Sequence, residues 1–459
     1  MPASLAASAG RHGSARPRSH SGNSEAALLD LGILAFIGLA ILATMTVSPP
    51  LLTHWKIQYV SAGGGFYEKL HPATYLVVLA LCLAMLRGVN PIQELVRIGL
   101  ESKAILLYLV CWGFLLVQTF VLDRPFTAVI DTLLLPVLMA VAIWQLPVAA
   151  RRPLVRLLHL LILVNVTIGY YEYFAGHRII PLTVGSILVL GEWRSTALLG
   201  HPLTASGLVG GYVLAIILKP QLCPQPLLRL PLVAFCLGSL MVFGGRTALV
   251  TTLVIIAGVI AFELFRVLRG GRIPLTTVIA AICVIFVGAA AVFWVLDQGV
   301  FDKMLLRFSS DKGSALARLA TLDMLNHLDW NEIILGPTAT RANALQSQLG
   351  LAYGVENFWI ACIVQFGLVH TVLMTLALAA FFAVLLQRST PAAYALLALI
   401  IVIAASSVSF SSKNIQLTQF VVLITLLLSR SEPSTARSSV RAQPIRSVRA
   451  PPLQAGSPP

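Results

Sequence analysis

Apolar runs of roughly 17–22 residues, separated by short polar segments, recur along most of the chain. A bilayer has no water to satisfy backbone groups, so such runs must cross it as helices, and the sequence lacks the alternation of barrel strands. The pattern predicts an all-α polytopic membrane protein. We expect about twelve transmembrane helices, at Leu28–Val47, Pro72–Leu86, Ala104–Leu122, Thr127–Leu146, Leu154–Tyr173, Leu203–Leu218, Leu230–Phe243, Thr247–Phe265, Leu275–Val295, Phe358–Leu386, Ala392–Val408 and Ile415–Leu428.

Composition agrees with this class. Hydrophobic residues make up 58% of the chain and charged residues 11%, whereas soluble domains average about 45–50% and about 25%. The net charge of +14 could suggest nucleic-acid binding. Membrane proteins, however, concentrate Lys and Arg in cytoplasmic loops, and the same surplus favours anionic lipid. We therefore expect membrane lipids, and no nucleic acid, among the partners.

The expected spans are interrupted by one long segment, Asp297–Asn357. The chain then divides into a tail (1–27), nine spans (28–296), a loop domain (297–357), three spans (358–429) and a second tail (430–459). Both tails are polar and basic with no apolar period, so we expect them to be disordered. Inside the loop domain, Lys312–Leu328 carries leucines at helical spacing, which predicts an amphipathic helix against the membrane surface or the bundle.

Basic residues are shared unevenly between alternate loops. The loops that carry Arg87, Arg151 and Arg266 are richer in Lys and Arg than the opposite set, which carries Lys69, Arg124 and Lys413. Basic loops stay in the cytoplasm, so we expect both termini there. The loop domain would then lie outside, in the periplasm of a Gram-negative bacterium, with the chain in the inner membrane.

Arginines gather on the expected outer face: Arg194, Arg246, Arg307, Arg318 and Arg341. An arginine there opposes the orientation rule and needs another reason. A guanidinium is always charged and presents a fork of donors that suits phosphate oxygens, so this cluster would suit a pyrophosphate-linked lipid. Alternatively, each arginine snorkels to lipid headgroups or pairs with a carboxylate.

Other polar residues lie at the same boundary. Glu356 precedes Asn357 at the entrance to a span, where a partly desolvated carboxylate could be a general base or could cap the helix. His201 could be a base, a ligand or a simple boundary residue. Asp131 and Glu172 lie within or at the ends of spans, where charge is costly and indicates function. For Asp131 we expect an arginine partner.

Metal and nucleotide sites are not indicated. The six cysteines show no CxxC or Cys/His ligand spacing, so we expect neither a zinc site nor a disulfide framework. The sequence holds no nucleotide-binding Gly-rich loop, nucleophile elbow, HExxH or DxD-like acid cluster. We therefore expect no metal and no cofactor, which argues against a metal-dependent cytoplasmic glycosyltransferase.

A series of short motifs runs through Glu192–Leu386: Arg194 with Gly200-His201-Pro202, Gly245-Arg246-Thr247-Ala248, Arg318, Leu335-Gly336, Glu356-Asn357 and Gln365-Phe366-Gly367-Leu368. In this order and topology they resemble the bacterial O-antigen ligase and O-antigen polymerase superfamily, including its exopolysaccharide polymerases. The resemblance implies a GT-C-like membrane enzyme that needs no metal. Such proteins transfer a glycan from undecaprenyl pyrophosphate to a sugar hydroxyl at the periplasmic face, and chain-length or export proteins are expected partners.

The resemblance also implies roles for individual residues. Arg194 and Arg246 would bind the pyrophosphate and stabilise the leaving group, and Arg318 would add to them. Glu356 stands where ligases have a histidine that activates the acceptor hydroxyl, which favours a polymerase-type or exopolysaccharide member. Leu335-Gly336-Pro337 also departs from the usual GxG pattern.

The remaining candidate positions are assigned to substrate binding: Arg341, His201 and Asn357. Two other classes of protein stay open. A secondary transporter or a lipid-linked oligosaccharide flippase would also have about twelve spans, although transporters tend to have repeated halves and polar groups near the midplane. The third class is a non-enzymatic scaffold for a polysaccharide assembly complex.

Overall fold

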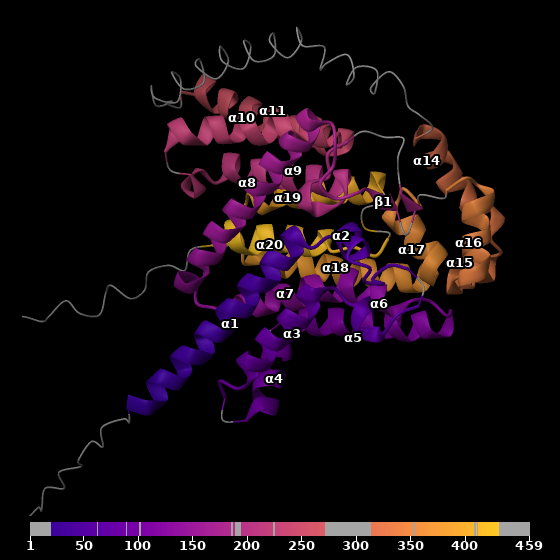
Figure 1. Cartoon of the computed structure of the whole chain (residues 1–459), viewed down its shortest axis with the longest axis horizontal. Coiled ribbons are helices and arrows are strands. Elements are labelled where there is room, and N and C mark those ends of the chain that lie inside the picture. Colours follow the sequence, from indigo (N-terminus) through magenta and orange to yellow (C-terminus); the bar gives the residue numbers. More distant parts are fainter. Residues whose placement is uncertain are drawn as a thin grey trace, which may run out of the picture.

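The computed structural model of the chain is a bundle of helices (Figure 1). It describes residues 20–61, 63–88, 90–100, 102–184, 187–188, 194–223, 225–270, 314–351, 354–407, 410 and 412–430. The expected span Leu275–Val295, Arg307 and most of both tails lie outside the described residues.

Six helical segments in the described residues are long and apolar enough to cross a membrane. They are the apolar part of α1 (His20–Thr46), α5 (Lys103–Val121), the continuous segment α6 (Phe126–Val129), η2 (Ile130–Leu134) and α7 (Leu135–Trp144), then α8 (Arg152–Ala175) with η3 (Val148–Arg151), α11 (Arg246–Leu268) and α18 (Leu368–Gln387). Five shorter apolar helices accompany them: α3 (Pro72–Met85), α9 (Pro202–Leu218), α10 (Pro226–Phe243), α19 (Ala393–Ser406) and α20 (Gln416–Leu427). The prediction of a multi-pass all-α membrane protein is confirmed, whereas the number of spans stays a prediction.

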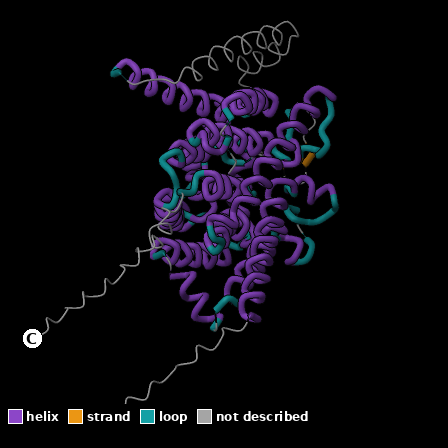
Figure 2. Tube along the Cα trace, turned by 90° about the vertical axis from the view of Figure 1, so that its left-hand side faces the viewer, coloured by secondary structure: helices purple, strands orange, loops and turns teal. Residues whose placement is uncertain are grey.

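The centre of the bundle is formed by α7, α9 and α20. Every residue of α20 is buried, and most of α9 is buried as well. Helix α20 packs against α7, α9 and α1, and α9 packs against α10, α11 and α19. Figure 2 shows the helices side by side with short loops at their ends. No face of α20 is exposed, and its buried residues include the polar side chains Gln416, Thr418, Gln419 and Thr425.

The connections contain small elements: α2 (Pro49–His54), η1 (Phe66–Lys69), α4 (Pro91–Leu100), η4 (Ala197–Leu199), η5 (Pro220–Leu222) and an antiparallel pair of two-residue strands, β1 (Thr183–Val184) and β2 (Ile187–Leu188). The described part of the loop domain consists of α14 (Ser314–Asp323), η6 (Met324–His327), α15 (Trp330–Leu335) and α16 (Ala339–Gln348). These helices lie along one edge of the bundle beside α17 (Phe358–Phe366), as Figure 1 shows. The expected helix Lys312–Leu328 is thus an α-helix followed by a 3-10 turn.

The loop domain is fastened to the bundle where a predicted helix breaks. The sequence predicts one span over Phe358–Leu386, but α17 ends at Phe366 and α18 starts at Leu368, with Gly367 between them at φ 84°. A Cβ on Gly367 would lie 2.4 Å from the carbonyl carbon of Leu335. Gly336, at φ 93°, faces it from the end of α15. Two glycines therefore allow the backbones to touch, and both adopt the left-handed region that favours glycine.

Arg124 strengthens this junction. One of its Nη2 hydrogens is donated to Pro337 O at 3.0 Å and one to Val364 O at 3.1 Å. Burial lowers the pKa of Arg124 to about 10, so the guanidinium stays charged at neutral pH. Arg124, which we expected in an outer loop, therefore connects the loop domain to α17 of the bundle.

The contacts also sort the loops into two ends. At one, which we call the Arg87 end, Arg87 donates to Gln145 O at 2.8 Å, and Lys219 donates to Leu427 O at 2.8 Å. At the other, the Asp131 end, residues of the α1–α3, α5–α6 and α19–α20 connections meet. This is the partition that alternate loops of a membrane bundle require. Which end faces the cytoplasm stays a prediction.

Candidate functional site

Asp131 is the centre of a buried polar cluster. It lies in the π-helical turn η2 and is fully buried. Its carboxylate accepts hydrogen bonds from Tyr59 Oη at 2.9 Å and Thr74 Oγ1 at 2.7 Å, and from the backbone N–H of His71 at 3.1 Å. All three donors belong to the α1–α3 connection or to the first turn of α3, so this part of the chain is tied to one carboxylate.

Lys413, from the α19–α20 connection, is the cation of this cluster. Its Nζ lies 3.9 Å from Asp131 Oδ2 and 3.8 Å from the centroid of the Tyr59 ring. It also donates to Tyr59 O at 3.0 Å and Thr127 Oγ1 at 3.3 Å. Burial lowers the pKa of Lys413 to about 8, against the opposing effect of Asp131. The expected arginine partner of Asp131 is therefore wrong in residue type: the partner is a lysine that the charge pattern marked only as an outer-loop residue.

The His71 side chain is also part of this cluster, and its ring is neutral. Its Nδ1 accepts from Ala73 N at 3.2 Å and so caps α3, which leaves Nε2 to donate to Val47 O at 2.7 Å. Burial lowers the pKa of His71 to about 4. A second proton would have to go to Nδ1, which already accepts a hydrogen bond.

We expect the stability of the folded chain to fall as the pH drops from about 6.5 towards 4. In that window the unfolded chain binds a proton at His71 that the folded chain excludes. The shift from 6.5 to about 4 corresponds to about 3 kcal/mol. Equilibrium unfolding of His71→Asn should show a flatter pH dependence over this window. An equally steep loss in the variant would assign the acid sensitivity to other groups.

Glu172 holds the segment that carries Arg194. Its fully buried carboxylate accepts from the backbone N–H groups of Ile179 at 2.9 Å, Thr196 at 2.8 Å and Ala197 at 3.0 Å. Asn165 adds a bond from Leu198 N at 3.1 Å. The Glu172 carboxylate, which the sequence marked as a candidate for chemistry, therefore holds the backbone of the α8–α9 connection in place. Its effect is to fix Arg194, which is half-buried, at the Asp131 end.

Arg246 is placed by a close approach of two helices. It is the first residue of α11 and is half-buried. Gly245 just before it packs on α9, because a Cβ there would stand 1.8 Å from Ser206 Oγ and 2.5 Å from Ser206 Cβ. A helix N-terminus also carries partial positive charge, which adds to the guanidinium for an anionic ligand.

Gly245→Ala is expected to cost about 1–3 kcal/mol because the new methyl overlaps Ser206. Gly245 has φ −83°, so the cost is contact and not backbone strain, and Ser206→Gly should recover part of it. Gly258, further along α11, has no atom within 4 Å of its ideal Cβ. Gly258→Ala should therefore be neutral or stabilising by up to about 1 kcal/mol. Thermal unfolding in detergent measures all three, and equal effects at both glycines would contradict the packing.

The Glu356-Asn357 pair lies where the loop domain returns to the bundle. Asn357 caps α17: its Oδ1 accepts from Trp359 N at 3.0 Å and Ile360 N at 3.2 Å. Its Nδ2 donates to Ala405 O at 3.2 Å, which ties this entrance to the end of α19. The cap is thus Asn357, and Glu356 is half-buried beside it.

Other predicted site residues have structural contacts. His201 caps α9, since its Nδ1 accepts from Leu203 N at 3.3 Å. Arg341 is exposed on α16 and donates to His327 O at 3.0 Å, with Glu332 Oε1 3.6 Å from its Nε. Arg318 belongs to α14, and its side chain lies outside what the structure describes.

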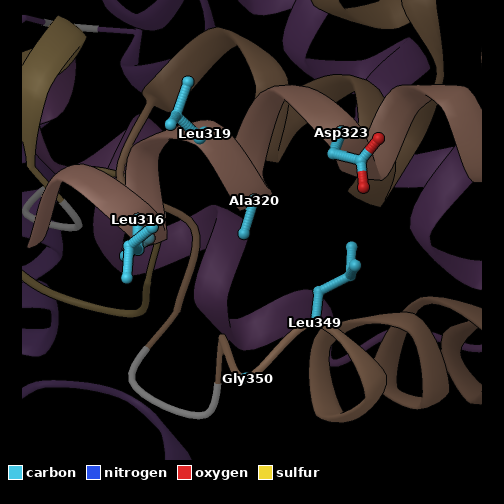
Figure 3. Close-up of a pocket in the computed structure, with 7 residues that line it drawn as sticks. Leu316, Leu319, Ala320, Asp323, Leu349 and Gly350 are labelled. Atoms are coloured by element: carbon cyan, nitrogen blue, oxygen red, sulfur yellow. The ribbon is translucent and has the colours of Figure 1, made fainter. Parts of the chain in front are cut away.

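A cleft of about 530 Å³ opens beside α14. Figure 3 shows α14 on one side and the end of α16 on the other, with one carboxylate at the rim. Its lining is mostly apolar: Leu316, Ala317, Leu319, Ala320, Asp323, Leu349 and Gly350. Leu316, Leu319 and Leu322 are exposed, so the face that we expected against the membrane surface or the bundle does not pack on described parts of the bundle.

Arg194, Arg246, His201 and Glu356 therefore lie on segments that share the Asp131 end of the bundle, because Gly200 packs on Ser48, Gly245 packs on Ser206, and Asn357 donates to Ala405 O. Helix α9 contacts η4, α11 and α19, and α19 contacts α17. No group of three His, Cys, Asp or Glu side chains in the described residues could hold a metal ion. No protein-family model matches the chain, and no curated protein matches it either.

Proposed function

We propose that the chain is a metal-independent membrane glycosyltransferase with a GT-C-like fold. It transfers a glycan from undecaprenyl pyrophosphate to a sugar acceptor at the periplasmic face of a bacterial inner membrane, as an O-antigen or exopolysaccharide polymerase or ligase. One observation supports it most. Arg194 and Arg246 are both half-buried on rigid backbone at one end of the bundle, the end that also holds Glu356.

The proposed reaction uses these groups in turn. Glu356 removes the proton of an acceptor hydroxyl, whose oxygen attacks the anomeric carbon of the donor. The bond from that carbon to the pyrophosphate oxygen breaks, and the leaving undecaprenyl pyrophosphate takes the electron pair. Arg194 and Arg246 stabilise the charge that develops on it. Because the leaving group is already an anion of two phosphates, fixed cations can replace a metal.

A transporter or flippase is the second candidate, and the Asp131–Lys413 pair is what favours it. A buried charge pair beside a π-helical turn is typical of ion or proton pathways. Against that role, the described hydrogen bonds satisfy both Asp131 oxygens and hold Lys413 on backbone carbonyls, which is typical of a structural cluster.

The test uses the purified chain in proteoliposomes with undecaprenyl-pyrophosphate-linked oligosaccharide and no divalent metal. Longer glycan together with free undecaprenyl pyrophosphate is the expected result. Movement of the lipid-linked oligosaccharide between leaflets without any new glycosidic bond would replace the proposal with the transporter. If folded samples, which unfold cooperatively, give neither longer glycan nor movement of the lipid-linked oligosaccharide, the result would favour the third class of protein, a non-enzymatic scaffold.

A further inference from the structure

Helix α4 (Pro91–Leu100) lies at the Arg87 end, in a segment that the sequence analysis treated as a basic loop. It links α3 to α5 and contacts both, and Figure 1 shows it at the margin of the bundle. It has ten residues, so it spans about 15 Å and cannot cross a bilayer. It follows the apolar helix α3 and precedes the candidate membrane span α5.

The side chains of α4 form three faces, because successive residues of a helix are turned by about 100°. Ile92, Leu95 and Val96 follow the i, i+3, i+4 pattern and are 71%, 52% and 49% exposed. Polar residues occupy the opposite face, where Arg97 Nε donates to Glu94 Oε2 at 3.0 Å. The side between them carries Ile98, which is buried in the bundle core.

This division fits one environment. A helix whose flank touches the bundle, while one free face is apolar and the opposite face is charged, is matched by the boundary between acyl chains and headgroups. A protein partner fits poorly, because a stable interface buries about 800 Å² and roughly 20–30 residues on each side. Three side chains on a short helix offer much less.

We propose that α4 lies in the plane of the membrane, with Ile92, Leu95 and Val96 in the acyl chains of the leaflet at the Arg87 end, and that it selects anionic lipid. Charge supports the second part. Arg97, on the polar face of α4, and Lys103, at the start of α5, are both exposed, and further cations of this end include Lys219, Arg388 and Arg430. Basic residues beside a leaflet attract anionic headgroups. The proposal does not depend on the transferase activity.

The experiment places a nitroxide on α4 in the full chain, after its cysteines are replaced, by Leu95→Cys or, as the matched control, Gln93→Cys. The samples are vesicles of phosphatidylethanolamine and phosphatidylglycerol. The Leu95 label should be several-fold more accessible to oxygen than to a water-soluble nickel complex, and the Gln93 label should show the reverse. Equal access to the nickel complex at both positions, or a Leu95 label shielded from both reagents, would overturn the in-plane placement.

A second pair of variants needs no cysteine replacement. In nanodiscs of the same lipids, Leu95→Asp should lower the unfolding temperature by several degrees and Gln93→Asp should not; equal shifts would count against the apolar contact. For lipid selection, the solubilised chain should retain phosphatidylglycerol at least twofold over phosphatidylcholine, and Arg97→Gln with Lys103→Gln should abolish the difference. Equal retention by the unaltered chain would overturn the anionic preference.

Discussion

Asp131→Ala is expected to destabilise the folded chain by about 3–5 kcal/mol, the cost of leaving one partner of a buried ion pair alone. The variant leaves the Lys413 ammonium buried, with a side chain only 10% exposed, and removes the acceptor of the Tyr59 and Thr74 hydroxyls. Equilibrium unfolding in mixed detergent micelles measures the loss.

Two further variants separate charge from packing. Adding Lys413→Met to Asp131→Ala should recover part of the stability, because the unpaired cation is gone while the packing defect remains. Thr74→Val removes a single hydrogen bond to Asp131 and should cost only about 1 kcal/mol. If Asp131→Ala lowered the free energy of unfolding no more than Thr74→Val does, the stabilising role of the buried Asp131–Lys413 ion pair would be contradicted.

The spans could be predicted because the bilayer sets the length of an apolar run. The expected Ala104–Leu122 and Leu28–Val47 agree within a residue with Lys103–Val121 and Ala27–Thr46. The break between α17 and α18 at Gly367 could not be predicted, because the apolar run continues through this glycine. The helix breaks where the backbone at Gly336, from a distant part of the chain, approaches it closely.

Part of the site was also within reach of the sequence. The cost of intramembrane charge marked Asp131, but not its partner, because nothing local to Lys413 distinguishes it from other loop lysines. Glu172 was marked for the same reason, yet it anchors backbone, since a carboxylate can be satisfied by N–H groups as well as by a cation. Helix α4 was not predicted, because a short helix flanked by basic residues has the same sequence pattern as a basic loop between two spans.

Arg246→Ala is expected to lower the rate of glycan transfer by about 10²–10³-fold, the usual loss when one preorganised donor to a developing charge is removed. The transfer rate of Arg246→Lys should lie between those of the unaltered chain and Arg246→Ala, because lysine keeps the charge but not the fork of donors that matches pyrophosphate oxygens. The rate of undecaprenyl pyrophosphate release in proteoliposomes measures both.

The matched control for Arg246→Ala is Arg269→Ala, at the opposite end of the same helix α11, where the guanidinium stands 4.2 Å from the Phe265 ring. Its rate should be unchanged. Since the charge on the leaving pyrophosphate grows in the transition state, Arg246→Ala should lower kcat more than it raises KM. A variant with unchanged kcat and raised KM would confine Arg246 to donor binding. Equal losses at Arg246 and Arg269 would trace the effect to α11 as a whole, against a catalytic Arg246.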